Sequence, residues 1–122
     1  MKQKRYSLGL DYGTNSCRAV LVDLGNGAEI ASHVFNYPTG EAGILLDPRE
    51  PNVARQHPAD YVRGAMECVR AVTRSAARTC RGFNAADIIG IGIDTTGSTP
   101  MPVDRNGTPL AMLPKFRRNP NA

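Results

Sequence analysis

Two short polar clusters in this 122-residue sequence hold residue types suited to binding phosphate groups, metal ions or hydroxyls. The first cluster follows a short apolar run, and its candidate ligand residues are Asp11, Gly13, Thr14, Asn15 and Ser16. Successive turn amides with nearby hydroxyls form a concavity that suits phosphate oxygens. A glycine there can adopt a positive φ and lets a ligand approach the backbone. The carboxylate could hold Mg²⁺ directly or through water, because hard cations prefer oxygen ligands. An ordinary hairpin with a polar tip explains this cluster equally well, since short glycine-containing motifs are weak evidence.

The second cluster is Asp94-Thr-Thr-Gly-Ser-Thr99, and it comes directly after the apolar run Asp87-Ile-Ile-Gly-Ile-Gly-Ile-Asp94. In open α/β sheets, ligands bind at the carboxyl ends of the strands. If the strands that precede the two clusters are parallel neighbours, both clusters open on the same side of the sheet. That coincidence favours a binding site over two unrelated turns.

The pattern of apolar residues predicts an α/β fold with a mixed sheet. Apolar runs at 8–10 and 19–22 around a tight turn predict a β-hairpin. An Asn-Gly turn then leads to a third strand over 28–37, and the short connections make these three strands antiparallel. Residues 38–56 contain several glycines and prolines and are predicted to form a long loop. The run at 88–93 is predicted to be a parallel strand buried on both faces, which joins the first strand by a right-handed crossover.

One helix is predicted between the loop and that last strand. Pro58 suits the first turn of a helix, where its missing N–H costs nothing. Residues that recur at helical spacing up to Arg78 predict one buried stripe, namely Val62, Ala65, Met66, Val69, Val72, Thr73 and Ala76. The arginines of the opposite face are interpreted as solvated, and Gly82 as the residue that ends the helix. His33 and His57 lack metal-ligand spacing and are predicted to be structural or exposed.

Composition excludes several classes of protein. The net charge of +4 is modest and too diffuse to argue for nucleic-acid binding. Three cysteines without a CxxC pair argue against a disulfide framework and for reduced thiols in a cytoplasmic protein. The basic N-terminus is not followed by the apolar stretch of a secretory signal. Nothing resembles a membrane span of about 20 apolar residues.

Several segments together resemble the N-terminal part of the FGGY family of carbohydrate kinases, and within it the ribulokinase branch. They occur in the family's order over nearly the whole chain: Gly9-Leu-Asp-Tyr-Gly-Thr14, Arg18-Ala-Val20, Tyr37-Pro38, His57-Pro-Ala-Asp-Tyr61, Gly90-Ile-Gly-Ile-Asp-Thr-Thr-Gly-Ser-Thr-Pro100, Pro102-Val-Asp104 and Asn119-Pro-Asn-Ala122. The first segment is shared with the wider superfamily of actin, sugar kinases and heat-shock ATPases. The segment at 94–100 is much more specific.

The resemblance implies a ribonuclease H-like fold and ATP-dependent phosphorylation of a ketopentose, L-ribulose, at its terminal hydroxyl, as in L-arabinose catabolism. ATP and Mg²⁺ are the implied cofactors. It assigns phosphate binding to Asp11, Gly13, Thr14, Asn15 and Ser16, with Asp11 also the implied metal ligand. Substrate binding falls to the hydroxyl-rich second cluster, namely Thr96, Gly97, Ser98 and Thr99.

The resemblance also implies that residues 1–122 are the N-terminal portion of the first of two domains. Family members are several times longer, and both the catalytic base and the adenosine-binding domain are expected beyond Ala122. No catalytic residue is therefore assigned within the chain, and the chain alone is predicted to be inactive. A homo-oligomeric full-length enzyme is compatible with the resemblance. Two alternatives stay open: a non-catalytic binding or interaction module with the same fold, and a kinase for another pentulose or a polyol.

Overall fold

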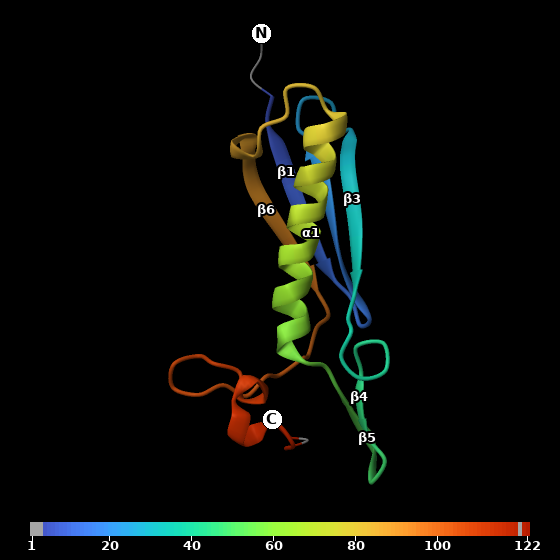
Figure 1. Ribbon diagram of the computed structural model, residues 1–122, viewed down its shortest axis with the longest axis vertical. Helices are drawn as coiled ribbons and strands as arrows, with labels where there is room; N and C mark the ends of the chain where they lie inside the picture. The colour runs from blue at the N-terminus through green and yellow to red at the C-terminus, as the bar shows by residue number, and fades with distance from the viewer. Residues whose placement is uncertain (1–3, 120) are drawn as a thin grey trace.

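The chain folds into one mixed sheet with a single long helix across one of its faces (Figure 1). The computed structural model describes residues 4–119 and 121–122. Its strands are β1 (Tyr6–Tyr12), β2 (Ser16–Asp23), β3 (Glu29–Asn36), β4 (Leu45–Asp47), β5 (Glu50–Arg55) and β6 (Ile88–Thr95). The long helix is α1 (Pro58–Thr79), and three short 3₁₀ turns are η1 (Ala85–Asp87), η2 (Leu110–Met112) and η3 (Pro114–Phe116).

The sheet has the strand order β3-β2-β1-β6. Strand β1 pairs antiparallel with β2, and β2 pairs antiparallel with β3. Strand β6 pairs parallel with β1, after α1 has returned the chain to the start of the sheet. The predicted sequence of three antiparallel strands, a helix and a parallel strand is confirmed.

Helix α1 begins where the sequence predicts it. The imidazole Nδ1 of His57 caps the first turn by accepting a hydrogen bond from the Ala59 amide at 3.1 Å, so His57 has a structural role. At the other end, α1 stops at Thr79 and Cys80 forms the cap. Gly82 lies beyond the helix, in a turn with a φ of 79°.

The buried face of α1 differs from the predicted stripe. It consists of Asp60, Gly64, Cys68, Val72 and Ala76. Val72 and Ala76 are buried as predicted, and Ala65 and Val69 are partly buried against the core, but the predicted members Val62 and Met66 are exposed. Helical periodicity of large apolar residues predicted the stripe, but the helix presents mostly small residues to the sheet. Small residues let the helix axis come close, because little side-chain volume separates the two backbones.

The core lies between this helix face and the covered side of the sheet. Its largest fully buried side chains are Tyr6, Leu8, Leu21, Val72, Cys17 and Cys68. Burial raises the pKa of the Cys17 thiol to about 12, and the neighbouring Cys68 adds to the effect. All three thiols are free, as the composition predicted. The thiols of Cys17 and Cys68 act here as packing groups.

Residues 38–56 are not the unstructured loop that the sequence predicted. The segment contains the two-stranded ribbon β4–β5, which is separate from the main sheet. Three hydrogen bonds from Arg49 to the Asp47 carboxylate, one from its amide at 3.0 Å and two from its guanidinium at 3.2 Å, stabilise the turn between its strands. The ribbon was not predicted because the segment contains prolines, and a proline within an apolar run usually argues against a strand.

Strand β6 has the predicted place beside β1 but not the predicted burial. Ile89, Ile91 and Ile93 are 58%, 61% and 67% exposed. The reason is topological: β6 is the edge of the sheet, and α1 packs over β2 and β3. The apolar run therefore predicted the strand correctly, but the burial of its side chains depends on which elements pack against it.

The segment after β6 forms a small irregular unit. An isolated bridge between Val103 and Pro109 closes a turn around Asn106 and Gly107, and η2 and η3 follow. It lies at the same end of the molecule as the start of α1 (Figure 1).

We predict that Gly64→Ala destabilises the chain although alanine is the better helix former. A Cβ at Gly64 would lie 3.0 Å from Cys17 Cβ and 3.3 Å from Phe35 Cδ1. This overpacking outweighs a helix-propensity gain of about 1 kcal/mol, so the free energy of unfolding should fall by about 1 kcal/mol. Urea denaturation measures it, with Gly90→Ala as the control because a Cβ there meets no atom within 4 Å. A more stable Gly64→Ala chain would contradict the close packing of α1.

We also predict that the exposed β6 edge makes the chain associate at high concentration. Edge strands with unpaired backbone groups and apolar side chains pair readily with other chains. Ile91→Lys should reduce concentration-dependent association, because an edge lysine must be desolvated when another strand pairs. Analytical ultracentrifugation over a concentration series measures the effect. Met66→Lys, an equivalent change on the exposed surface of α1, should leave association unchanged.

Candidate functional site

The structure brings the two polar clusters together at one end of the sheet. In the parallel pairing of β1 with β6, Asp11 lies opposite Asp94 and Tyr12 lies opposite Thr95. Just beyond the strands, the Thr96 amide donates a hydrogen bond to the Tyr12 carbonyl at 3.1 Å. The clusters are 83 positions apart in sequence (94 − 11) and lie side by side in the fold.

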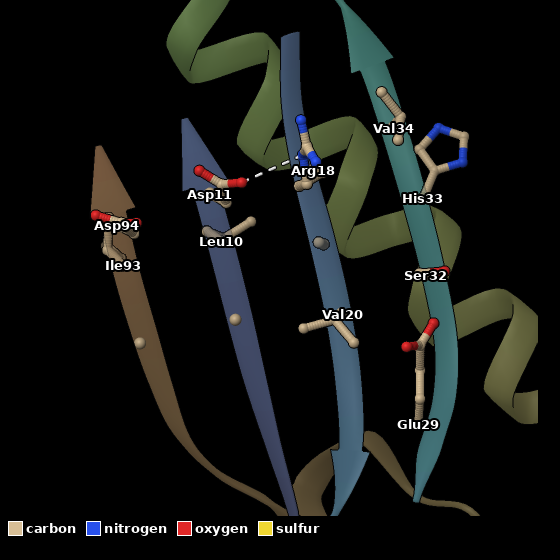
Figure 2. Close-up of a pocket in the computed structure, with 13 residues that line it drawn as sticks. Leu10, Asp11, Arg18, Val20, Glu29, Ser32, His33, Val34, Ile93 and Asp94 are labelled. Atoms are coloured by element: carbon tan, nitrogen blue, oxygen red, sulfur yellow. Dashed lines mark ion pairs between the residues drawn. The ribbon is translucent and has the colours of Figure 1, made fainter. Parts of the chain in front are cut away.

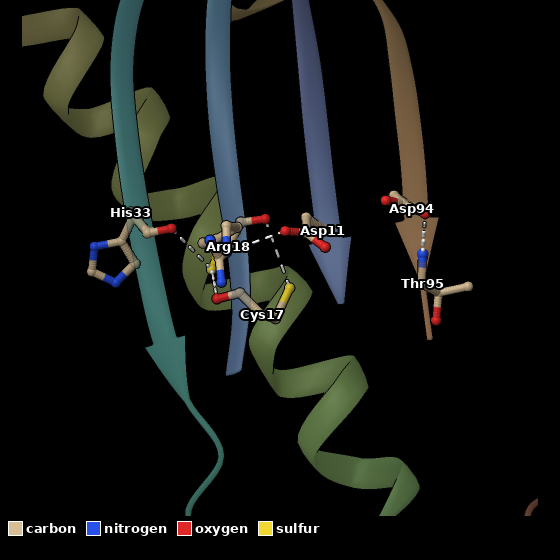
Figure 3. Close-up of polar contacts among 7 residues, drawn as sticks. Asp11, Cys17, Arg18, His33, Asp94 and Thr95 are labelled. Atoms are coloured by element: carbon tan, nitrogen blue, oxygen red, sulfur yellow. Dashed lines mark hydrogen bonds and ion pairs between the residues drawn. The ribbon is translucent and has the colours of Figure 1, made fainter. Parts of the chain in front are cut away.

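The two carboxylates lie on the face of the sheet that α1 leaves uncovered (Figure 2). With Arg18 on β2 they line a shallow hollow of about 660 Å³. Arg18 Nε lies 3.2 Å from Asp11 Oδ2, and both side chains are about half exposed. Solvent screens such a pair, which contributes less than about 1 kcal/mol to stability. Asp94 is oriented separately, because its Oδ1 accepts a hydrogen bond from the Thr95 amide at 2.9 Å (Figure 3).

Oxygen ligands at this end of the sheet fit a magnesium ion in chemistry. Mg²⁺ is usually bound through one or two carboxylates together with water and phosphate oxygens. Asp11 and Asp94 supply two carboxylates at neighbouring register positions. Within residues 4–119 and 121–122, no group of three or more His, Cys, Asp or Glu side chains is placed to hold a metal. Among the described residues, these two carboxylates could supply only part of the coordination shell of a magnesium ion.

The turn between β1 and β2 is tight, and some of its polar groups make hydrogen bonds within the fold. The Gly13 amide donates to the Ser16 carbonyl at 2.8 Å, and the φ of Gly13 is not positive, contrary to expectation. A Cβ on Gly13 would lie 3.3 Å from that carbonyl, so glycine serves a close approach of backbone. Asn15 donates its side-chain amide to the Ala42 carbonyl at 2.7 Å. Thr14 is exposed at the tip.

The second cluster lines a larger groove of about 1170 Å³ at the same end. Thr96, Ser98 and Thr99 are among its lining residues, and Gly97 is not. Gly97 is exposed, and a Cβ there would meet no atom within 4 Å. Ser98 has a φ of 55°, which is uncommon for a residue other than glycine and is typical of functional turns. The Thr99 hydroxyl donates to the Gly97 carbonyl at 3.4 Å.

Two residues that the motif analysis did not assign connect the clusters. The Gln56 side-chain amide donates to the Thr14 carbonyl at 2.6 Å. The Tyr61 hydroxyl donates to Gln56 Oε1 at 2.9 Å and lies 3.4 Å from Thr96 Oγ1. No motif or periodicity pointed to Gln56, which is the last residue of the segment predicted as a loop. Tyr61 belongs to the segment His57–Tyr61 that resembles the family, but no binding role was assigned to it from the sequence.

Stacked aromatic rings hold Tyr61 in place. Its ring stacks on the ring of Tyr12, with the centroids 4.9 Å apart and an interplanar angle of 9°. It also stacks on the ring of Tyr37, with the centroids 5.3 Å apart and an interplanar angle of 20°. Burial raises the pKa of Tyr37 above its usual value. The Tyr37 hydroxyl is buried without a hydrogen-bond partner among the described residues.

The Asp60 carboxylate accepts hydrogen bonds from the amide and the hydroxyl of Thr39, which ties the first turn of α1 to the loop after β3.

A family model decides the relationship that these features suggest. The model of the FGGY family of carbohydrate kinases, N-terminal domain, matches residues 6–114. The chain belongs to this family. Both polar clusters lie within the matched residues, so the end of the sheet described above is part of the FGGY domain.

Individual relatives agree with the family. A ribulokinase of Geobacillus thermodenitrificans is 46% identical over 123 residues, covering 98% of this chain and 21% of the relative. A ribulokinase of Vibrio parahaemolyticus is 40% identical over 119 residues, covering 98% of this chain and 20% of the relative. The chain therefore spans about a fifth of the length of the curated FGGY relatives that it matches.

Solved structures of sugar kinases share the fold. A xylulose kinase from Brucella ovis superposes with a TM-score of 0.70 at 20% identity, over 87% of this chain and 20% of that chain. A gluconate kinase from Lactobacillus acidophilus superposes with a TM-score of 0.58 at 22% identity. The superposition covers 77% of this chain and 16% of the gluconate kinase chain. Along residues 4–119 and 121–122 of the FGGY chain, no helix has both the length and the apolar character needed to cross a membrane.

Proposed function

We propose that this chain forms the first part of an ATP-dependent kinase that phosphorylates a ketopentose, with L-ribulose as the favoured substrate. The observation that carries the proposal is the meeting of the two polar clusters, where Asp11 lies beside Asp94 and the Thr96 amide bonds to Tyr12. The similarity to ribulokinases supports the choice of sugar. The rest of the enzyme supplies the catalytic base and the adenosine pocket. Free thiols support a cytoplasmic location.

In this proposal the uncovered face of the sheet serves the phosphate side of the reaction. ATP with Mg²⁺ supplies the phosphoryl group and neutralises its charge when bound. Asp11 and Asp94 present carboxylate oxygens to the metal, and Arg18 orients the Asp11 carboxylate through their contact. The turn with Gly13, Thr14, Asn15 and Ser16 offers backbone amides and hydroxyls to phosphate oxygens. These groups bind and orient, as phosphoryl transfer requires of a protein.

The groove beside this face serves the sugar in the same proposal. Thr96, Ser98 and Thr99 line it with hydroxyls that match those of an open-chain ketose. A site built from such groups rejects ligands that lack the matching hydroxyl, because a buried polar group would then stay unpaired. Gly97 lies between these residues in sequence but does not line the groove, so it has no direct contact with the sugar in this proposal.

A chimeric enzyme tests the function directly. This chain replaces the matching segment of the Geobacillus thermodenitrificans ribulokinase, and ADP release is measured with L-ribulose, other pentuloses and ribitol. We expect L-ribulose-dependent turnover by the chimera and none by residues 1–122 alone, because this proposal places the catalytic base and the adenosine pocket in the rest of the enzyme. Turnover with another pentulose or a polyol alone would contradict the choice of sugar. A folded chimera without any kinase activity would favour the non-catalytic module.

In the chimera, Asp11→Asn should lower kcat by about 100-fold, the typical cost of one lost charge-stabilising contact at a reacting centre. The sugar KM should change little, because the hydroxyl groove is intact. The side chains are nearly isosteric, so the fold should persist. Asp23→Asn, at the opposite end of β2, is the control. An unchanged kcat for Asp11→Asn would return the turn to an ordinary hairpin tip.

Thr96→Val in the chimera removes one hydroxyl from the groove and keeps the side-chain shape. The sugar KM should rise by about tenfold, the equivalent of one lost hydrogen bond of about 1.4 kcal/mol. Steady-state kinetics over a range of L-ribulose concentrations give KM and kcat separately. Thr73→Val, whose hydroxyl bonds within α1, is the matched control. A sugar KM equal to that of the unmodified chimera would exclude Thr96 from the sugar site.

A further inference from the structure

A row of polar groups runs from the first cluster to the second. It starts at the Thr14 carbonyl, passes through the side chains of Gln56 and Tyr61, and reaches Thr96, with separations of 2.6, 2.9 and 3.4 Å. We call Gln56 and Tyr61 the bridge. The bridge comes from the segment between β5 and the first turn of α1, so it belongs to neither cluster.

The chemistry of the groups fixes the direction of every hydrogen bond in the row. The Thr14 carbonyl can only accept, so the Gln56 NH₂ group must face it. Gln56 Oε1 then faces Tyr61 and can only accept, so the Tyr61 hydroxyl donates its single proton to Gln56 Oε1. In the contact with Thr96, the Tyr61 oxygen must therefore accept the Thr96 proton. Thr96 Oγ1 keeps both lone pairs. The Thr99 hydroxyl lies 3.5 Å away but donates to the Gly97 carbonyl, so Thr96 Oγ1 is left as an acceptor for a ligand hydroxyl.

The same bridge also fixes the other cluster. The peptide unit between Thr14 and Asn15 is planar, so its N–H points away from its C=O. Because Gln56 holds the Thr14 carbonyl, it sets the direction of the Asn15 N–H, one of the turn amides available to an anion. Stacking of the Tyr61 ring on the rings of Tyr12 and Tyr37 restricts movement of the bridge.

We propose that Gln56 and Tyr61 are positioning residues that couple the phosphate turn to the hydroxyl groove. The proposal rests on the function proposed above and names how its two half-sites act together. Phosphate bound at the turn holds the Thr14–Asn15 peptide, the bridge holds Thr96 as an acceptor, and a polyhydroxylated ligand then binds a groove that is already oriented. By linkage, sugar binding strengthens phosphate binding by the same factor.

The first test needs no ligand. Backbone amide and methyl NMR signals are compared between the unmodified chain and Gln56→Glu, which can accept from Tyr61 but cannot donate to Thr14. Gln56→Glu should shift the signals of Thr96, and Tyr61→Phe should shift the Asn15 amide. Tyr37→Phe is the matched control, because it removes an unpartnered hydroxyl from a ring of the same stack. Unmoved Thr96 signals in a folded Gln56→Glu chain would overturn the bridge.

The second test measures coupling in the same chain with two probes, L-ribulose and inorganic tripolyphosphate. We expect saturating tripolyphosphate to tighten L-ribulose binding by about fivefold, at the low end of typical couplings. Tyr61→Phe should abolish this factor while each probe still binds, and Tyr37→Phe should retain it. A packing role alone would not move the factor.

The outcomes separate the two proposals. Binding of both probes without coupling, or equal coupling in Tyr61→Phe, overturns the positioning role and leaves the proposed function intact. Failure of both probes to bind, with the ligand-free shifts present, counts against the proposed function of this end of the sheet, and the positioning role fails with it. Coupling that depends on the Tyr61 hydroxyl supports both.

Discussion

Parallel pairing of β1 with β6 is the constraint on which the rest of the molecule depends. Two strands that lie far apart in sequence can run in the same direction only if the chain returns across the sheet between them, and α1 makes that return. Their register sets Asp11 beside Asp94 and brings the chain that leaves β6 against the end of β1. A shift of one residue would turn the carboxylates to opposite faces of the sheet, because side chains alternate along a strand.

The small residues on the buried face of α1 serve the same arrangement. Gly64 lets the helix lie against Cys17 and Phe35, which fixes how close the first turns of α1 come to the end of the sheet. That closeness places Tyr61 between Tyr12 and Tyr37 and within reach of Thr96. Core packing and site geometry are therefore set by one helix–sheet contact. A change in that contact would alter stability and the relative positions of the two clusters together.

Much of this arrangement could be predicted from local pattern. Hairpin signals, the N-terminal proline of α1 and the apolar run of β6 are short-range features, and they gave the element order and placed both clusters at strand ends. Features that depend on tertiary neighbours could not be predicted. The buried side of α1 and the exposure of Ile91 are decided by what packs nearby, which periodicity does not report. The Gln56–Tyr61 bridge joins residues whose partners, Thr14 and Thr96, lie in separate elements, so no motif contains it.

The reactivity of the buried thiols of Cys17 and Cys68 is a chemical probe of the contact between α1 and the sheet. Cys17 on β2 and Cys68 on α1 are buried between the sheet and the helix, while Cys80, just past the end of the helix, is only partly covered. A thiol that is enclosed and protonated reacts with an alkylating reagent only during transient opening of the structure around it. Alkylation of Cys17 and Cys68 thus reports how often α1 separates from the sheet, whereas alkylation of Cys80 reports fraying at the helix end. The chain can in this way record two kinds of opening, local and sub-global, without an added label.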